Sequence, residues 1–469
     1  MFDLIIKNAD IATASERYTC DIGIRDGRIA ALAQGLEGAR ETVDASGYLV
    51  LPGGVDAHCH LDQPMPEGVR MADDFLSGTR SAACGGTTTV IPFAAQEKGQ
   101  SLRAAVQDYH QRAQGKAAID YAFHLIVSDA TPEVLDRELP ELIREGYTSF
   151  KIYMTYDDLK LSDLEILKVL DVARGEGALV MIHAESADCI TWLTERLSAA
   201  GHTEPHYHAV SRPSAVEREA THRAITFSEL VDVPILIVHV SGREAIAQIH
   251  WAQGKGLKIH AETCPQYLFL TQDHLEEPHF HGAKFVCSPP PRDKDNQQAV
   301  WNGLEKNIFS VFSSDHAPFN FEDPCGKKLG GREPDFQYIP NGIPGLETRL
   351  PLLFSGGVNE GRLNVHQFVA LTATNPAKLY GLYPRKGSIV IGGDADLVLW
   401  KTDLEVTIRN EALHHAVDYT PYEGITVRGW PMMTFSRGKL VSKDFQFVGE
   451  AGAGEFMPCQ KPTLDGRLR

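Results

Sequence analysis

The chain has 469 residues and a formal net charge of −17, with 43% hydrophobic and 23% charged residues. This composition is that of a globular protein, and the length fits one large domain with a smaller one. The excess of acidic residues, without a run of lysine or arginine, argues against nucleic acid and anionic membranes as partners. No apolar run approaches the ~20 residues of a membrane helix.

Two further features predict a cytoplasmic protein. The first residues, MFDLIIKNAD, lack the basic and long apolar regions of a secretory signal. The eight cysteines are scattered and form no CxxC pair. We therefore expect free thiols in a reducing compartment, and no zinc site built from cysteines.

Short strand patterns and turns occupy both ends of the chain. Segments such as LIIKNADIAT and CDIGIRDGRIAAL near the start are matched by GSIVIGGDADLVLWK near the end. The sequence therefore predicts a small β-sandwich domain formed by residues 1–54 and 385–443. Residues 55–384 would form the domain between them, and residues 444–469, which show no periodicity, a C-terminal arm.

Eight apolar strand candidates recur in the middle of the chain, and helical patterns lie between several of them. The strands are expected at 48–60, 87–95, 119–127, 148–156, 178–186, 234–242, 257–265 and 308–318. Eight strands alternating with helices over roughly 270 residues predict an α/β fold of the (β/α)8 TIM barrel type, for which ~250 residues is usual. The rival, an open doubly wound sheet that binds a dinucleotide, is disfavoured because no GxGxxG follows the first strand.

Helix starts and one long loop are also predictable. Ser101 fits an N-cap, and the apolar spacing over 214–231 predicts a helix in which Ser214 and Glu217 fit a capping box. Residues 319–345 follow the eighth strand as a long loop. Such a loop would lie on the face of the barrel that carries active sites.

Polar residues stand in or directly after five of the eight strands, close to their carboxyl ends. These residues are His58, His60, Lys151, His183, His239 and Asp315. In a barrel these strand ends meet at one rim. His58 and His60, two residues apart, would point to the same face. Neutral imidazoles are good ligands for zinc, cobalt, nickel or manganese, and an aspartate adds an oxygen ligand that can also handle protons.

Each of these residues also has an ordinary structural interpretation. A single histidine at a strand end, such as His239, usually makes only a hydrogen bond. Asp315, beside two serines, fits a helix N-cap or a turn. A strand lysine such as Lys151 usually faces solvent. Together these interpretations are weak, because five strands would need polar ends at matching positions for unrelated reasons.

Lys151, in the strand-like segment TSFKIYMTY, has a chemical interpretation in such a site. Two divalent ions ~3.5–4 Å apart usually need a bridging anion. Lysine is a cation, but burial lowers the pKa of its amine and keeps a neutral nucleophile available. Reaction with carbon dioxide would turn the amine into a carbamate, which can serve as the bridging carboxylate.

Several motifs together carry a specific resemblance. They include PGGVDAHCH, TSFKIYMTY, MIHAE, IVHVS, AETCPQYL, CSPPPR, SSDHAPF and IPNGIPG. From about residue 3 to about residue 445 the sequence resembles the cyclic amidohydrolases, and among them the hydantoinase/dihydropyrimidinase branch. The resemblance implies a metal-dependent (β/α)8 barrel with a β-sandwich side domain, commonly assembled as a homotetramer.

The resemblance also implies two divalent metal ions, commonly zinc, bridged by a carbamylated lysine at Lys151. A bridging hydroxide would be the nucleophile, and Asp315 its proton shuttle. The implied ligand sets are His58, His60, Lys151 and Asp315 for one ion, and Lys151, His183 and His239 for the other.

Three further residues would contact the substrate, by the same resemblance. Tyr156 would donate to the developing oxyanion, whereas Ser288 and Asn341 would hold the amide edge of the ring, largely through backbone groups. The alternative for Tyr156 is aromatic packing, and for the other two residues turn formation. Candidates for the apolar lining of the substrate gate are Met65, Met71, Phe93 and Tyr153.

The implied reaction is hydrolysis of the cyclic amide bond of hydantoins or dihydropyrimidines to N-carbamoyl amino acids. Asp62 occupies the position where dihydroorotases usually carry an arginine, and allantoinases usually lack a tyrosine like Tyr156. Allantoinase and cyclic imide hydrolase nevertheless stay open as alternatives. A non-catalytic scaffold protein of this fold would have lost metal ligands, whereas this chain keeps every implied ligand position.

Overall fold

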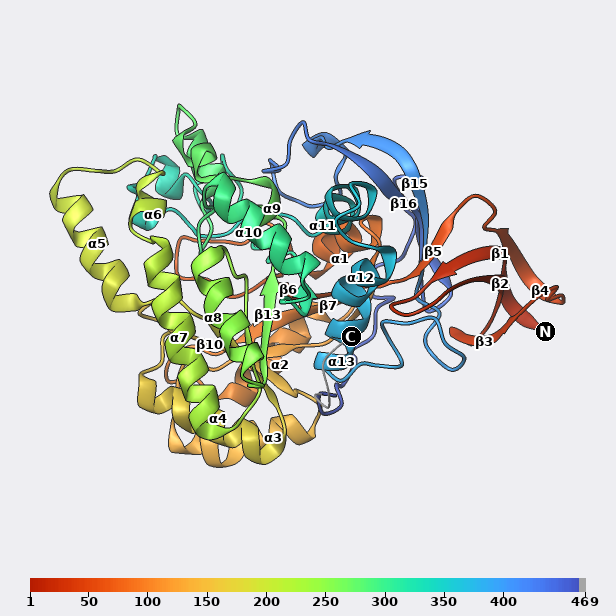
Figure 1. Ribbon diagram of the computed structural model, residues 1–469, viewed down its shortest axis with the longest axis horizontal. Helices are drawn as coiled ribbons and strands as arrows, with labels where there is room; N and C mark the ends of the chain where they lie inside the picture. The colour runs from red at the N-terminus through yellow and green to blue at the C-terminus, as the bar shows by residue number, and fades with distance from the viewer. Residues whose placement is uncertain (464–469) are drawn as a thin grey trace.

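The computed structural model describes residues 1–463, which form a barrel ringed by helices and a β-sheet at its side (Figure 1). Residues 464–469 lie outside the described part. The predicted C-terminal arm, 444–469, is therefore followed only as far as residue 463.

Eight parallel strands in the described chain form the barrel sheet, in the order β14-β13-β12-β11-β10-β9-β7-β6. Their bounds are β6 Gly54–Cys59, β7 Thr87–Ala95, β9 His124–Ile126, β10 Ser149–Tyr153, β11 Leu179–His183, β12 Ile235–Ile237, β13 Ile259–Thr263 and β14 Val311–Phe312. The short strand β8 (Asp120–Tyr121) pairs with β7. A parallel bridge between Cys59 and His316 links the first strand to the segment after the last. The predicted (β/α)8 barrel is confirmed.

Side chains of the barrel strands alternate between two apolar cores. In β11, Leu179 and Met181 belong to the cluster inside the barrel, whereas Val180 and Ile182 belong to the cluster that includes the helix faces. Every residue of this strand is buried. Burial on both faces explains why the sequence shows continuous apolar runs here.

Helices surround the barrel sheet (Figure 1). Their bounds are α1 Phe75–Cys84, α2 Leu102–Ala113, α3 Leu139–Arg144, α4 Asp163–Glu176, α5 Ala187–Ala199, α6 Tyr207–Val210, α7 Ser214–Val231, α8 Arg243–Gly254, α9 Gln266–Phe269, α10 Lys294–Glu305, α11 Arg349–Leu353, α12 Val365–Val369 and α13 Asn375–Leu379. Within residues 1–463, none of them is long and apolar enough to cross a membrane.

Of the two predicted helix starts, one is confirmed and one is wrong. The Ser101 side chain accepts a hydrogen bond from the Ala104 amide and caps α2. Helix α7 covers the predicted range, but Ser214 is its first residue and makes no cap. Glu217 is instead buried and accepts a hydrogen bond of 2.8 Å from the Ser241 amide. A tertiary partner therefore outcompetes the local capping box.

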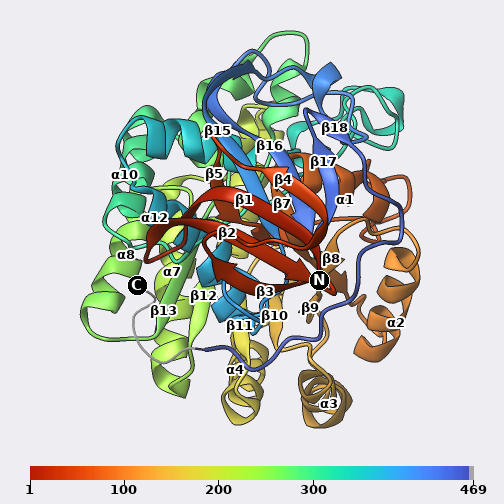
Figure 2. The same ribbon diagram turned by 90° about the vertical axis from the view of Figure 1, so that its right-hand side faces the viewer.

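A second sheet combines the two ends of the chain (Figure 2). Its strands are β1 Phe2–Ala12, β2 Arg17–Arg25, β3 Arg28–Ala33, β4 Ala39–Asp44, β5 Leu49–Pro52, β15 Leu397–Thr407, β16 Thr426–Ser436, β17 Lys439–Lys443 and β18 Gln446–Phe447. Antiparallel pairing of β5 with β15 joins the amino-terminal strands to the carboxyl-terminal ones. A β domain built from both chain ends is thus present, while its exact limits at 54 and 385 stay a prediction.

The segment after β18 packs against the barrel of its own chain. Its backbone donates from Met457 to Tyr121 (2.7 Å) and from Cys459 to Gly146 (2.9 Å), and both donors are buried residues. Tyr121 and Gly146 precede barrel strands β9 and β10. Figure 2 shows this dark-blue segment leaving the sheet and passing the ends of these strands. The first part of the predicted arm thus belongs to the sheet through β18, and its later described part lies at the amino-terminal end of the barrel.

A buried ionic cluster connects the sheet domain with the barrel. The Lys386 ammonium lies 2.6 Å from Asp120 of β8, 3.0 Å from Asp394 and 2.7 Å from Asp396, and it is 1% exposed. Burial alone would lower the pKa of Lys386, but the three carboxylates outweigh it and raise that pKa. The ammonium thus stays charged and compensates part of the buried negative charge.

Replacing Lys386 with methionine is expected to lower the free energy of unfolding by about 3–5 kcal/mol, because three buried carboxylates lose a shared counter-ion. Arg437 and Arg385 still pair with Asp120 and Asp394, so the loss is greatest for Asp396. Urea denaturation measures the change. The matched control is Lys439→Met, at an exposed position of β17. An unchanged free energy of unfolding for Lys386→Met would contradict this role of the cluster.

Candidate active site

A cavity of about 660 Å³ opens at the carboxyl ends of the barrel strands. Most of the predicted site residues line it: His60, Lys151, Tyr156, His183, His239, Ser288, Asp315 and Asn341. His58 is fully buried and lies against Lys151 and Asp315. The structure therefore brings together side chains from β6, β10, β11 and the segments after β12 and β14.

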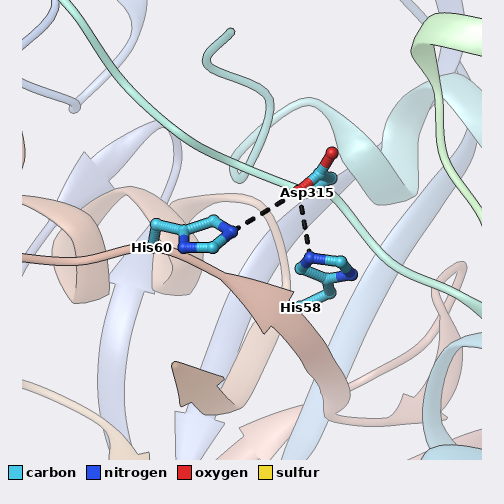
Figure 3. Close-up of side chains that lie close together, drawn as sticks. All are labelled: His58, His60 and Asp315. Atoms are coloured by element: carbon cyan, nitrogen blue, oxygen red, sulfur yellow. Dashed lines mark ion pairs between the residues drawn. The ribbon is translucent and has the colours of Figure 1, made fainter. Parts of the chain in front are cut away.

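His58, His60 and Asp315 form a compact group (Figure 3). The Nε2 atom of His58 lies 3.0 Å from Asp315 Oδ1, and that of His60 lies 3.6 Å from the same oxygen. One ligand atom from each residue falls within 4.8 Å of the others. The Nδ1 atom of His60 lies 2.6 Å from Gln63 Oε1, which orients the ring.

Lys151 is 2% exposed, so it does not face solvent. Its Nζ lies 2.8 Å from His58 Nε2 and 4.7 and 4.9 Å from the ring centres of Phe93 and Tyr153. Within residues 1–463 no carboxylate oxygen lies within 4.0 Å of this nitrogen. Burial lowers the pKa of Lys151 to about 8, even though Asp315 raises it. The amine is therefore partly neutral near pH 8.

His183 and His239 complete the set of histidines. Their ring centres are 4.4 Å apart, and that of His239 is 5.4 Å from His58. Burial lowers the pKa of His183 and holds that of His239 well below its usual value, and it lowers the pKa of His60 to about 4. These three rings are neutral at pH 7, which is the form that binds metals. For His58, burial is outweighed by Glu262 and Asp315, which raise its pKa.

Two buried glutamates at the site were not predicted from the sequence. Glu262 Oε1 lies 2.6 Å from His58 Nδ1, and Glu185 Oε2 lies 2.7 Å from His183 Nε2. Burial would raise the pKa of Glu185, but Arg212 and His183 lower it to about 2. Metal-binding histidines usually pair their second ring nitrogen in this way. Two sequence features could have indicated these glutamates: the two-residue spacing of His183 and Glu185 in MIHAE, and Glu262 near the end of the strand IHAET.

The donor set fits divalent cations. His58, His60 and Asp315 offer two imidazoles and a carboxylate within 4.8 Å of one another, and the ring of His239, next to that of His183, lies beside His58. The second nitrogens of His58, His60 and His183 are held by neighbouring side chains. His239 Nδ1 is buried without a hydrogen-bond partner in the described structure. An unsatisfied buried nitrogen in a cluster of imidazoles fits the chemistry of a metal site.

The sequence is similar to that of a known enzyme family. The family model described as "Amidohydrolase family" matches residues 49–441. The chain belongs to the amidohydrolase family. It is 46% identical over 460 residues to D-hydantoinase of Geobacillus stearothermophilus, covering 97% of this chain and 96% of that protein. The D-hydantoinase of Rhizobium radiobacter is 45% identical, with 98% of this chain and 99% of that one covered.

Solved structures show the same likeness. Dihydropyrimidinase from Brevibacillus agri superimposes with a TM-score of 0.94 at 44% identity, covering 98% of this chain and 99% of that one. A D-hydantoinase structure gives a TM-score of 0.95 at 44% identity, with 98% and 100% covered. The likeness of this amidohydrolase to these proteins therefore extends over both the barrel and the sheet domain.

Three candidate residues of this amidohydrolase adopt an unusual backbone conformation. The φ angles are 67° at Tyr156, 39° at His239 and 49° at Asp315. Residues other than glycine rarely adopt such positive φ angles. These angles persist only where the surrounding structure enforces them. Each residue lies two or three positions after the end of a barrel strand, and its side chain lines the cavity.

Tyr156, Ser288 and Asn341 meet at the cavity. Burial raises the pKa of the Tyr156 phenol, while Arg212 and the neighbouring Ser288 and Asn341 partly offset this rise. The phenol is therefore protonated at neutral pH and can donate a hydrogen bond. The Oδ1 atom of Asn341 is buried without a partner within residues 1–463.

Three of the four residues predicted to line the substrate gate line the cavity, and the fourth does not. Met65, Met71 and Tyr153 line the cavity, together with Phe319 of the long loop. Phe93 is fully buried, and its ring centre lies 5.0 Å from those of both His58 and His60. It therefore packs against the imidazoles rather than lining the gate, because its position in β7 points into the barrel core.

Proposed function

We propose that this protein hydrolyses the cyclic amide bond of hydantoins and dihydropyrimidines and releases N-carbamoyl amino acids, as a hydantoinase of the D type. The observation that carries the proposal is Lys151, which is buried 2.8 Å from His58 among the other histidines and has no carboxylate partner in the described part of the chain. The near full-length relatives named D-hydantoinase and dihydropyrimidinase support the same reaction.

The proposed cofactor is a pair of divalent ions, zinc in the first place, with Lys151 carbamylated as the bridge. His58, His60 and Asp315 would hold one ion, and His183 and His239 the other. When bound, such ions lower the pKa of water to ~7 and polarise a carbonyl. Two finer proposals remain: a homotetramer, which rests on the family resemblance alone, and a cytoplasmic location, which rests on the scattered cysteines of the sequence.

Residues of the chain itself would then transfer the proton and stabilise the developing negative charge. Asp315 would accept the proton of the attacking water at its carboxylate and return it to the leaving ring nitrogen. Burial would raise the pKa of Asp315, but the surrounding histidines, His58 first, hold it well below its usual value. It is thus ionised and ready to accept. The Tyr156 hydroxyl would donate to the oxygen that gains charge.

Ser288 and Asn341 would orient the ring. Both line the cavity on the side of Tyr156, and each offers an amide or hydroxyl group beside backbone polar groups. A hydantoin and a dihydropyrimidine share an amide edge with alternating donors and acceptors, which such groups can pair. Holding that edge fixes the distance from the scissile carbonyl to Asp315 and Tyr156.

Initial rates of the metal-loaded protein on hydantoin, a 5-substituted hydantoin, dihydrouracil, allantoin and a simple cyclic imide test the proposal. We expect ring opening of the hydantoins and dihydrouracil to exceed that of allantoin and the imide. Preference for allantoin would assign the protein to the alternative reaction. Absence of turnover on all five rings, despite bound metal, would contradict the proposed function.

A further inference from the structure

Lys327 is a fully buried lysine on the long loop that follows the last barrel strand. Its Nζ donates to the carbonyl oxygens of Val286 (2.9 Å) and Pro340 (2.6 Å). Within residues 1–463 no carboxylate lies within ion-pair distance of this nitrogen, and burial lowers the pKa of Lys327 to about 7. Burying a lysine without a counter-ion is costly, so its retention requires a reason.

The two carbonyls belong to the segments that carry the proposed substrate contacts. Val286 is two residues before Ser288, and Pro340 directly precedes Asn341. The Val286 oxygen also accepts a hydrogen bond of 3.0 Å from the Gly342 amide. Lys327 and this backbone bond therefore hold the two segments against each other beside the cavity.

The conformation of the loop places the Lys327 side chain against these two carbonyls. The Lys327 amide donates to the Asn320 carbonyl at 2.8 Å, which folds the loop back on itself. The neighbouring Gly326 permits this approach, since a Cβ there would lie 2.0 Å from the Asn320 oxygen. The Phe321 amide donates to Asp418 Oδ1 at 2.6 Å and anchors the loop to the chain's carboxyl-terminal part.

We infer that Lys327 is a positioning residue for the ring-binding groups, because it ties the Ser288 segment to the Asn341 segment. This inference rests on the proposed function. Lys327 contacts no substrate in this arrangement. Its hydrogen bonds fix the spacing of the two segments. They also polarise the Val286 and Pro340 carbonyls, and this polarisation makes the N–H groups of the same two peptide bonds stronger hydrogen-bond donors. A ring with an amide or imide edge is the ligand that benefits.

Replacing Lys327 with methionine keeps the length of the side chain and removes both hydrogen bonds. We expect KM for hydantoin and dihydrouracil to rise by roughly ten- to a hundredfold, with kcat within about threefold, because ring placement is lost while the reacting groups stay. Bound metal per chain should stay at the wild-type value. Steady-state kinetics and metal analysis of the metal-loaded protein measure these quantities.

Lys328 provides the matched control. It is the next residue on the same loop, but it pairs with Glu322 at 2.7 Å and lies over the Phe321 ring. The Lys328→Met variant is expected to keep the wild-type KM. Equal KM values for Lys327→Met and wild type would overturn the inference, as would an equal rise in both lysine variants.

The Lys327→Gln variant distinguishes loss of the two hydrogen bonds from a general loss of stability. It also replaces the methionine variant if that variant does not fold. Its amide can donate to both carbonyls, so KM should recover at least partly towards the wild-type value. Hydrogen exchange supplies a readout without substrate: amides of 286–288 and 341–343 should exchange faster in Lys327→Met than in Lys328→Met. Unchanged exchange would overturn the tie even if the wild type opened no ring and the proposed function failed.

Discussion

Lys151→Ala is expected to bind fewer than two divalent ions per chain and to open hydantoin rings roughly a thousandfold more slowly than the wild type, or slower still. In the proposed site Lys151 would bridge the two ions, once its amine is a carbamate. Its partly neutral amine, with a pKa of about 8, suits that reaction. Alanine would leave the histidines and Asp315 without a bridging anion. Metal analysis and ring-opening rates at saturating zinc measure both effects.

Lys160→Ala is the control for this variant. Lys160 lies nine residues further along, and its ammonium pairs with Asp157 at 2.5 Å on an exposed part of the loop. It should keep wild-type metal content and rate. Thermal unfolding of Lys151→Ala checks that the protein is folded. Two tightly bound ions together with full activity in Lys151→Ala would contradict the bridging role.

Asp315→Asn is expected to lower kcat by roughly a hundred- to ten-thousandfold, the range for loss of a general acid–base group. Asparagine keeps the shape of the side chain but neither accepts the proton of the attacking water nor returns it to the ring nitrogen. The carboxylate lies 3.0 Å from His58 and 3.6 Å from His60, so metal affinity is expected to fall as well. Single-turnover rates at metal saturation separate the chemical step from metal loss.

The control for this second variant is Asp158→Asn. Asp158 also lines the cavity, but it is exposed at the mouth. Its charge is solvated, so we expect kcat within about twofold of the wild type. If Asp315→Asn retained the wild-type kcat at full metal occupancy, Asp315 would not be the proton shuttle.

Much of the barrel was predictable because parallel strands buried on both faces must be apolar along their length. The run ALVMIHAES gave β11, and the four- and three-residue spacing of apolar positions gave α7. The convergence of His58, His60, Lys151, His183, His239 and Asp315 followed from their shared place at strand ends.

Residues whose role depends on a tertiary partner were not predictable. Glu262 looks like any acidic residue in the sequence until His58 and the His239 amide are seen to pair with it. Lys327 and Lys328 are adjacent and chemically identical, yet one is fully buried and the other makes a surface ion pair. Only the folding of the loop distinguishes the two lysines.

Metal held by this cluster is proposed to enable ring opening. The most direct measurement is the hydantoin hydrolysis rate of metal-free protein as zinc is added back in known amounts per chain. We predict no turnover without metal and a rate that rises until two ions are bound. Full turnover by the metal-free protein, or a rate independent of bound zinc, would contradict the account.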